Sequence, residues 1–167
     1  MTVKIRFATP ADADQILSFI RGLAAYQHAE GVVRASAAEM RAQMASAAPP
    51  FECLIAEAGA APVGFALFYR GYSTWLGQSL LFLEDLFIEP AARGTGAGIA
   101  LIKRIARIAA DRGYWRVEWR VLDSNTPARR FYQALGGEPL DDWTVWRLEG
   151  AELAALAAAP AADSASA

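Results

Sequence analysis

The stretch LLFLEDLFIEPAARGTGAGIALIKRIARIAADR, residues 80–112, puts an apolar strand, a glycine-rich turn and an amphipathic helix in immediate succession. The pattern predicts a strand over residues 80–88, ended by Glu89-Pro90, and a helix over about residues 97–112. Three glycines at alternate positions let the intervening backbone turn sharply and approach a ligand closely, because no Cβ is present. They are Gly94, Gly96 and Gly98. The opening N–H groups of the helix, at the positive end of its dipole, suit a phosphate or pyrophosphate.

Comparison with known phosphate-binding motifs narrows the possible functions of this loop. A Walker loop is excluded, because Ile99 and Ala100 follow Gly98 where Lys and Ser/Thr are required. A Rossmann fingerprint is disfavoured, because its third glycine position falls on Ile99 or on Leu101. The pattern Arg/Gln-x-x-Gly-x-Gly/Ala after a strand is matched in full, from Arg93 to Gly98. A tight strand-to-helix turn without a ligand is the structural alternative.

Composition and length limit the class of protein. The 167 residues are enough for one domain with a substantial core, and the net charge of -2 gives no support to a nucleic-acid partner. No apolar run is long enough for a membrane span, and the N-terminus has no secretion signal. The single Cys53 cannot form an internal disulfide, and His28 has no cluster that would bind a metal. We therefore expect a cytoplasmic protein without a metal.

Hydrophobic periodicity and turn residues predict an α/β domain with a mixed sheet. Strands are predicted over residues 3–8, 51–57, 63–69, 80–88, 115–121 and 145–148. Helices are predicted to begin at Thr9-Pro10 and to cover about residues 36–46, 97–112 and 128–135, and residues 71–77 are predicted to be a loop. The alanine-rich stretch after Gly150 is expected to form one or two helical turns, and residues 160–167 are expected to be disordered.

These motifs and their order resemble the GCN5-related N-acetyltransferase (GNAT) superfamily over about residues 3–150. The segments FLEDLFI (residues 82–88), the Arg-Gly loop and residues 125–136 resemble the spermidine/spermine (diamine) acetyltransferase branch. The segment YSTWLG (residues 72–77) is most similar to the thialysine N-epsilon-acetyltransferase type. The resemblance implies a mixed central sheet flanked by helices, a splayed-strand acetyl-CoA cleft, and a homodimer. The acetyltransferase domain would cover residues 1–150, and residues 151–167 would be a tail.

The resemblance also implies where acetyl-CoA binds. Its pantetheine arm would add to the sheet along the backbone of Leu86, Phe87 and Ile88, and an N–H group there would polarise the thioester oxygen. Its pyrophosphate would bind the glycine loop: Arg93, Gly94, Thr95, Gly96, Ala97, Gly98 and Ile99. Asn125 would cap the following helix and contact the cofactor.

Two side chains are candidates for the chemistry. Tyr132 matches the general acid of the family, since a phenol is protonated at neutral pH and can donate to the departing thiolate; its alternative role is core packing beside Phe131. Glu84 would contact the acceptor amine and relay its proton through water; its alternative is a surface position or a salt bridge. Strand alternation predicts that Asp85 points to the opposite face, so the two acids should not share a role.

The acceptor pocket is predicted to include Tyr26, Gln27, Trp75, Glu84 and Glu118, although a structural role for Glu118 is equally compatible with its position. The polyamine enzymes carry acids where this chain has Gln27 and Ser73, and the segment from Tyr69 to Ser79 contains Arg70 and no acid. We therefore expect a small thialysine-like, lysine-like or diamine acceptor. The alternatives are a polyamine or protein amine, or a non-catalytic acyl-CoA-binding module. Trp143 and Trp146 are assigned either to the core or to a dimer surface.

Overall fold

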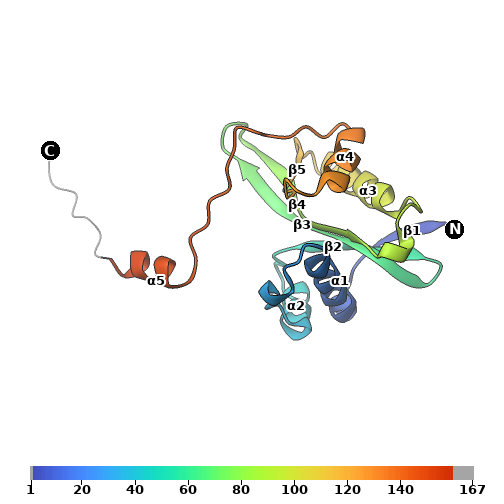
Figure 1. Cartoon of the computed structure of the whole chain (residues 1–167), viewed down its shortest axis with the longest axis horizontal. Coiled ribbons are helices and arrows are strands. Elements are labelled where there is room, and N and C mark those ends of the chain that lie inside the picture. Colours follow the sequence, from blue (N-terminus) through green and yellow to red (C-terminus); the bar gives the residue numbers. More distant parts are fainter. Residues whose placement is uncertain (1, 160–167) are drawn as a thin grey trace. The chain divides into compact units, whose positions relative to one another are not determined.

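The computed structural model describes residues 2–159 and contains one five-stranded sheet (Figure 1). Its strands lie in chain order: β1 (Val3–Phe7), β2 (Glu52–Ala58), β3 (Ala61–Ser73), β4 (Gln78–Ile88) and β5 (Val117–Trp119). Neighbouring strands are antiparallel except for β4 and β5, which are parallel. The predicted mixed sheet is thus confirmed.

Helices cover both faces of this sheet. On one face lie α1 (Ala13–Tyr26) and α2 (Ala37–Met44), and on the other lies α3 (Ala97–Asp111) (Figure 1). The α1-side cluster of buried residues is Ala13, Ile16, Leu17, Phe19, Met40, Cys53, Ile55, Phe65, Leu67 and Phe87. The α3-side cluster is Leu54, Ala56, Ala66, Phe68, Leu81, Leu83, Ala97, Leu101, Ile105, Ile108 and Ala109. The strands between these layers are apolar on both faces, which explains their nearly continuous hydrophobic runs.

Helix α1 crosses very close to β4. A Cβ added to Gly22 would lie 2.8 Å from the ring of Phe87, so only glycine allows the helix to approach the strand this closely. Phe19 of the same helix stacks on Phe65 with ring centroids 5.6 Å apart. This packing sets the position of the C-terminal end of α1, where Tyr26 lies.

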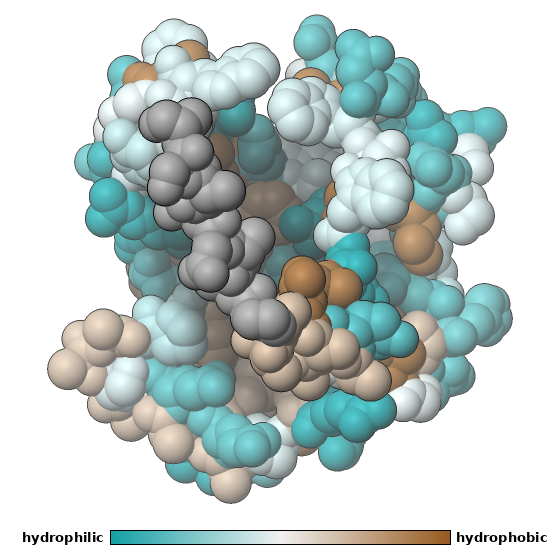
Figure 2. Space-filling model, turned by 90° about the vertical axis from the view of Figure 1, so that its left-hand side faces the viewer, coloured by the Kyte–Doolittle hydropathy of each residue, from teal (hydrophilic) through white to brown (hydrophobic). Residues whose placement is uncertain are grey.

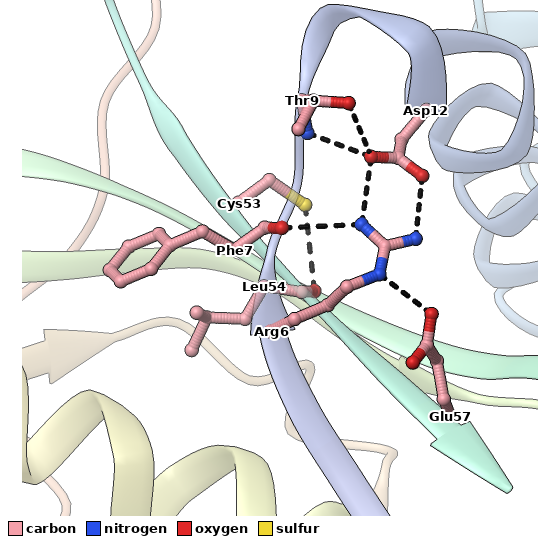
Figure 3. Close-up of polar contacts among 7 residues, drawn as sticks. All are labelled: Arg6, Phe7, Thr9, Asp12, Cys53, Leu54 and Glu57. Carbon is pink, nitrogen blue, oxygen red and sulfur yellow. Dashed lines mark hydrogen bonds and ion pairs between the residues drawn. The ribbon is translucent and has the colours of Figure 1, made fainter. Parts of the chain in front are cut away.

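An arginine network joins the start of the α1 layer to the sheet (Figure 3). Arg6 of β1 donates to both Asp12 oxygens, at 2.7 and 2.8 Å, and to Glu57 of β2 at 2.6 Å. The backbone N–H of Thr9 donates to the same Asp12 carboxylate at 2.7 Å. Hydrogen bonds from Arg6 lower the pKa of Asp12 to about 2. Bidentate pairing of this kind fixes geometry as well as adding stability.

The chain divides into two compact units, residues 1–120 and 121–167. In the second unit, α4 (Thr126–Ala134) is capped by Asn125, whose Oδ1 accepts from the N–H of Ala128 at 3.2 Å. The alanine-rich α5 (Gly150–Ala158) confirms the predicted helical turns, and Figure 2 shows this stretch in the light brown of weakly apolar residues. The domain boundary at residue 150 stays a prediction.

Three predicted elements differ from the structure. The strand predicted over residues 115–121 is shorter and covers only β5 (Val117–Trp119). The predicted loop over residues 71–77 is too long, because cross-strand pairs extend to Ser73 opposite Gln78 and leave only residues 74–77 as the connection. The predicted strand over residues 145–148 is wrong: these residues form no strand, and Trp146 is 90% exposed. An alternating apolar pattern forms a strand only where a neighbouring edge accepts it. The tail residues 160–167 lie outside the described residues.

Candidate active site

The glycine loop has the backbone conformation that its sequence predicts. Gly94 and Gly96 have φ values of 77° and 89°, in the left-handed region that favours glycine, and α3 begins at the next residue, Ala97. Apart from the glycine itself and its two chain neighbours, no residue in the described part of the chain has an atom within 4 Å of a Cβ built on Gly94 or Gly96. The N-cap residue Gly96 has no side chain to cap the helix, so it leaves the first N–H groups of α3 without a side-chain cap. The loop therefore offers donors and room for an anion.

Arg93 brings the predicted cofactor loop next to the predicted acceptor pocket. Its Nε donates to the carbonyl of Ile88 at 3.2 Å, and its guanidinium carbon lies 4.7 Å from the centre of the Tyr26 ring. Stacking on a ring leaves the in-plane N–H groups available for other partners. Arg93 is thus held beside the loop with donors that can reach an anion.

The strands β4 and β5 separate at the middle of β4. Their parallel pairing covers only Leu81 to Leu83, while β4 continues to Ile88. Within residues 2–159, no strand pairs with this second half of β4 on its β5 side. The backbone of Leu86, Phe87 and Ile88 thereby forms a free sheet edge that leads to the glycine loop. This is the splayed-strand arrangement that the resemblance implies.

A β-bulge changes the expected positions of the two acids on β4. Leu83 pairs with Phe68 and Asp85 pairs with Leu67, so Glu84 is the extra residue of the bulge. Leu67 belongs to the α1-side cluster, which places Asp85 on that face. Phe68 belongs to the α3-side cluster, so its strand neighbour Tyr69 faces the α1 side. Glu84 hydrogen-bonds to Tyr69 and therefore lies on the α1 side as well. The prediction that the acids point to opposite faces is therefore wrong, since simple alternation does not hold across a bulge.

Aromatic and charged side chains surround Glu84 on this face. The rings of Tyr69 and Phe82 stack with centroids 5.1 Å apart, and the guanidinium carbon of Arg120 lies 5.0 Å from the centre of the Phe82 ring. Burial raises the pKa of Tyr69; the charge of Glu84 raises it further, Arg120 lowers it, and a hydrogen bond to Glu84 adds to the rise. Glu84 and Arg120 are both exposed, so this group is open to solvent. The sequence patterns did not identify Tyr69 or Arg120 as site residues. The signal that could have identified Arg120 is its spacing of two residues from Glu118, because residues two apart in a strand share a face.

Asp85 is half-buried beside Glu84. Burial, and then the negative charge of Glu84, raise the pKa of Asp85 to about 6. Cys53 on the same face is a buried free cysteine. Burial raises the pKa of its thiol, so the thiol stays protonated and is not a nucleophile. The carboxyl of Asp85 thus titrates closer to neutral pH than an ordinary aspartate does.

Other predicted acceptor residues are spread along the sheet. Glu118 of β5 lies opposite Phe82 and forms an ion pair with Arg116 at 2.7 Å. Gln27 is exposed at the C-terminal end of α1, beside Tyr26. Trp75 is 88% exposed at the tip of the β3–β4 hairpin, at the opposite end of the eleven-residue β4. Since eleven strand residues span roughly 30 Å, the structure does not bring Trp75 and Tyr26 together within one chain.

Two predicted functional residues lie in the second compact unit. Tyr132 is in α4, where its ring meets that of Phe131 edge-on at 5.2 Å. Burial raises the pKa of Tyr132 to about 12, so its phenol stays protonated throughout the neutral range. Asn125 forms the helix cap that the sequence predicts. The chemical roles of both residues remain predictions.

Comparison with known proteins identifies the family. The model of the acetyltransferase (GNAT) family matches residues 19–137. The chain belongs to the GNAT acetyltransferase family. It is 37% identical over 166 residues to the thialysine N-epsilon-acetyltransferase of Bos taurus, covering 93% of this chain and 97% of that protein. It is also 30% identical to the spermidine/spermine N(1)-acetyltransferase-like protein 1 of Homo sapiens, over 92% of this chain and 24% of that protein. This GNAT protein is accordingly an N-acetyltransferase.

Solved structures agree with the GNAT fold. An integron cassette protein from the mobile metagenome of V. cholerae matches 95% of this chain and 99% of its own, with a TM-score of 0.78 and 25% identity. An aminoglycoside acetyltransferase from a soil metagenomic sample matches with a TM-score of 0.73 at 17% identity, over 88% of this chain and 97% of its own. In the described part of the chain, no helix is both long and apolar enough to cross a membrane. No metal-binding group of His, Cys, Asp and Glu occurs among residues 2–159.

Proposed function

We propose that this protein transfers the acetyl group of acetyl-CoA directly to a primary amine of a small thialysine-like, lysine-like or diamine molecule. The observation that carries the proposal is the free edge of β4 leading into the open glycine loop. The extent of the match to a thialysine N-epsilon-acetyltransferase supports the acceptor class. A homodimer in the cytoplasm is part of the proposal.

The residues present fit acetyl-CoA. The free backbone groups from Leu86 to Ile88 would pair with the pantetheine amides, as an added strand does. The open glycines, Gly94 and Gly96, leave room for the pyrophosphate against the N–H groups of α3, and Arg93 is held beside them. Bound there, acetyl-CoA supplies the activated acetyl group as a thioester.

The chemistry needs a proton acceptor for the amine and a proton donor for the leaving thiolate. Glu84 would take the amine proton through water; its exposure and its place at the bulge give water access to its carboxylate. Tyr132 would donate to the sulfur, for which its raised pKa keeps the phenol protonated. No covalent acetyl-enzyme is required, because the amine attacks the thioester directly, and the thiol of Cys53 is buried.

Charge balance favours a small acceptor over a polyamine. The face around Glu84 carries Glu118, which is paired with Arg116, and also the cation Arg120. A polycation prefers a channel lined by carboxylates, and Arg120 opposes it. Polyamine or protein-amine acetylation is the alternative within the same chemistry, and a non-catalytic acyl-CoA-binding module is the alternative from another class.

The first test is thiol release from acetyl-CoA with thialysine, lysine, spermidine, putrescine and a lysine peptide. We expect turnover of thialysine well above that of spermidine. The reverse ranking would keep the enzyme but refute the small-acceptor proposal. No release with any amine, with acetyl-CoA binding intact, would favour the binding-module alternative.

The second test replaces the proposed acid. Tyr132→Phe should retain acetyl-CoA affinity and lower kcat by at least about 100-fold, because general acid catalysis contributes roughly 100- to 10,000-fold. Tyr114→Phe is the matched control, since Tyr114 packs against the α3-side cluster and should keep full turnover. Equal kcat values for the two variants would remove Tyr132 from the mechanism.

A further inference from the structure

Arg120 and Glu84 place opposite charges on one open face of the sheet. Both are exposed, and both act electrostatically on Tyr69, which lies on that face. The free edge of β4, where the thioester would lie, begins at Glu84. A cation and an anion therefore lie beside the proposed reaction centre, at separate points.

The two charges contact different rings of one stacked pair. The ring centre of Phe82 is 5.1 Å from that of Tyr69 and 5.0 Å from the guanidinium carbon of Arg120. Tyr69 in turn hydrogen-bonds to Glu84. Glu84 thus contacts the Tyr69 side of this ring pair and Arg120 the Phe82 side, and no ion pair joins them among residues 2–159.

Arg120 differs from the other arginine on its strand face. Arg116 is neutralised by Glu118 at 2.7 Å, whereas Arg120 has no ion-pair partner among residues 2–159. A surface arginine without a partner is common, but its side chain usually moves freely. The contact with Phe82 orients this guanidinium and leaves its in-plane donors available, the geometry suited to a carboxylate.

We propose that Arg120 is a specificity-determining residue that binds the carboxylate of an amino-acid acceptor while its side-chain amine lies at Glu84. A lysine-like molecule carries its ammonium and its carboxylate at separate ends, matching the two separated charges of the site. A diamine or polyamine has only ammonium groups, which Arg120 repels. This inference rests on the proposed acetyl transfer and names the feature of the acceptor that the site selects.

The test compares lysine with cadaverine, which is lysine without its carboxylate, in the wild-type protein and in Arg120→Gln. We expect Arg120→Gln to lower kcat/KM for lysine by at least about tenfold, because a charge-assisted contact is lost. The loss should come from KM with little change in kcat, since Arg120 does not touch the reacting atoms. The value of kcat/KM for cadaverine should stay equal or rise.

Two further variants make the result specific. Arg120→Lys keeps the charge without the planar fork, so its preference for lysine should be intermediate. Arg116→Gln removes a neighbouring cation that is already paired, so it should leave the lysine-to-cadaverine ratio unchanged.

Equal losses for both acceptors in Arg120→Gln would overturn the inference, because a structural role affects both. Equal wild-type use of lysine and cadaverine would also overturn it, while leaving the proposed acetyl transfer intact. If the wild-type protein acetylates no amine at all, the proposed function itself fails.

Discussion

Asp85 shows how the surroundings of a single residue change its chemistry. Its carboxyl is half-buried on the α1 side of the sheet, and the adjacent Glu84 adds a like charge. Both effects favour the neutral acid, so the pKa rises from 3.8 to about 6. Ionised Asp85 therefore costs stability in the folded protein at neutral pH.

We expect Asp85→Asn to be more stable than the wild-type protein at pH 7.5, by about 3 kcal/mol, because each unit of pKa shift corresponds to about 1.4 kcal/mol. The folded carboxyl holds its proton more tightly than the unfolded one, so the wild-type penalty is absent below about pH 4, grows between about pH 4 and pH 6, and is constant at higher pH. Urea unfolding of both proteins across this range measures the difference. A difference that is independent of pH would contradict the assignment.

At the scale of elements, the turn between β4 and α3 depends on backbone conformation. Gly96, which immediately precedes α3, has a φ of 89° and open space around a built Cβ. Alanine would fit sterically at this position but would be strained by its backbone angle, and its methyl group would occupy the open surface of the loop. Stability and ligand affinity can therefore be separated at this element.

Gly96→Ala should lose about 1 kcal/mol of stability and also weaken CoA binding several-fold. Gly113→Ala is a matched control, since Gly113 follows the other end of α3 with a φ of 66° and equally open space. It should lose similar stability with unchanged CoA affinity. Thermal unfolding and CoA titration check both variants, and equal weakening of CoA binding by the two would place the anion elsewhere.

At the scale of the whole molecule, the segment between α4 and α5 exposes large apolar side chains. Val145 and Trp146 are 64% and 90% exposed, so the core assignment left open for Trp146 does not hold within one chain. A dimer surface is the alternative that remains, in keeping with the proposed homodimer. Large exposed apolar groups in sequence succession are typical of an interaction surface.

Trp146→Glu is expected to shift the protein from dimer to monomer in sedimentation velocity, because a carboxylate would be buried at the interface. Val32→Glu is the control: Val32 is 69% exposed in the first compact unit and should leave the dimer intact. A monomeric wild-type protein, or a Trp146→Glu dimer, would remove this segment from the interface.

Local sequence determined most of the elements and the glycine loop. Apolar periodicity, the helix-starting Thr9-Pro10 and the alternating glycines act over a few residues, so a linear pattern contains them. The strand predicted at residues 145–148 failed because a strand also needs an edge to pair with, and no local pattern supplies one. For the same reason the β3–β4 hairpin is longer than its turn residues indicate.

Only the tertiary structure decided the composition of the candidate site. The sequence by itself identified Glu84 and the Arg93 loop, because their residue types and spacing carry the family pattern. It could not show that a bulge turns Asp85 to the face of Glu84, since bulges arise from register between strands. Nor could it show that Arg120 lies over Phe82 or Arg93 over Tyr26. Those contacts join side chains distant in the chain, and the packing of strands and helices creates them.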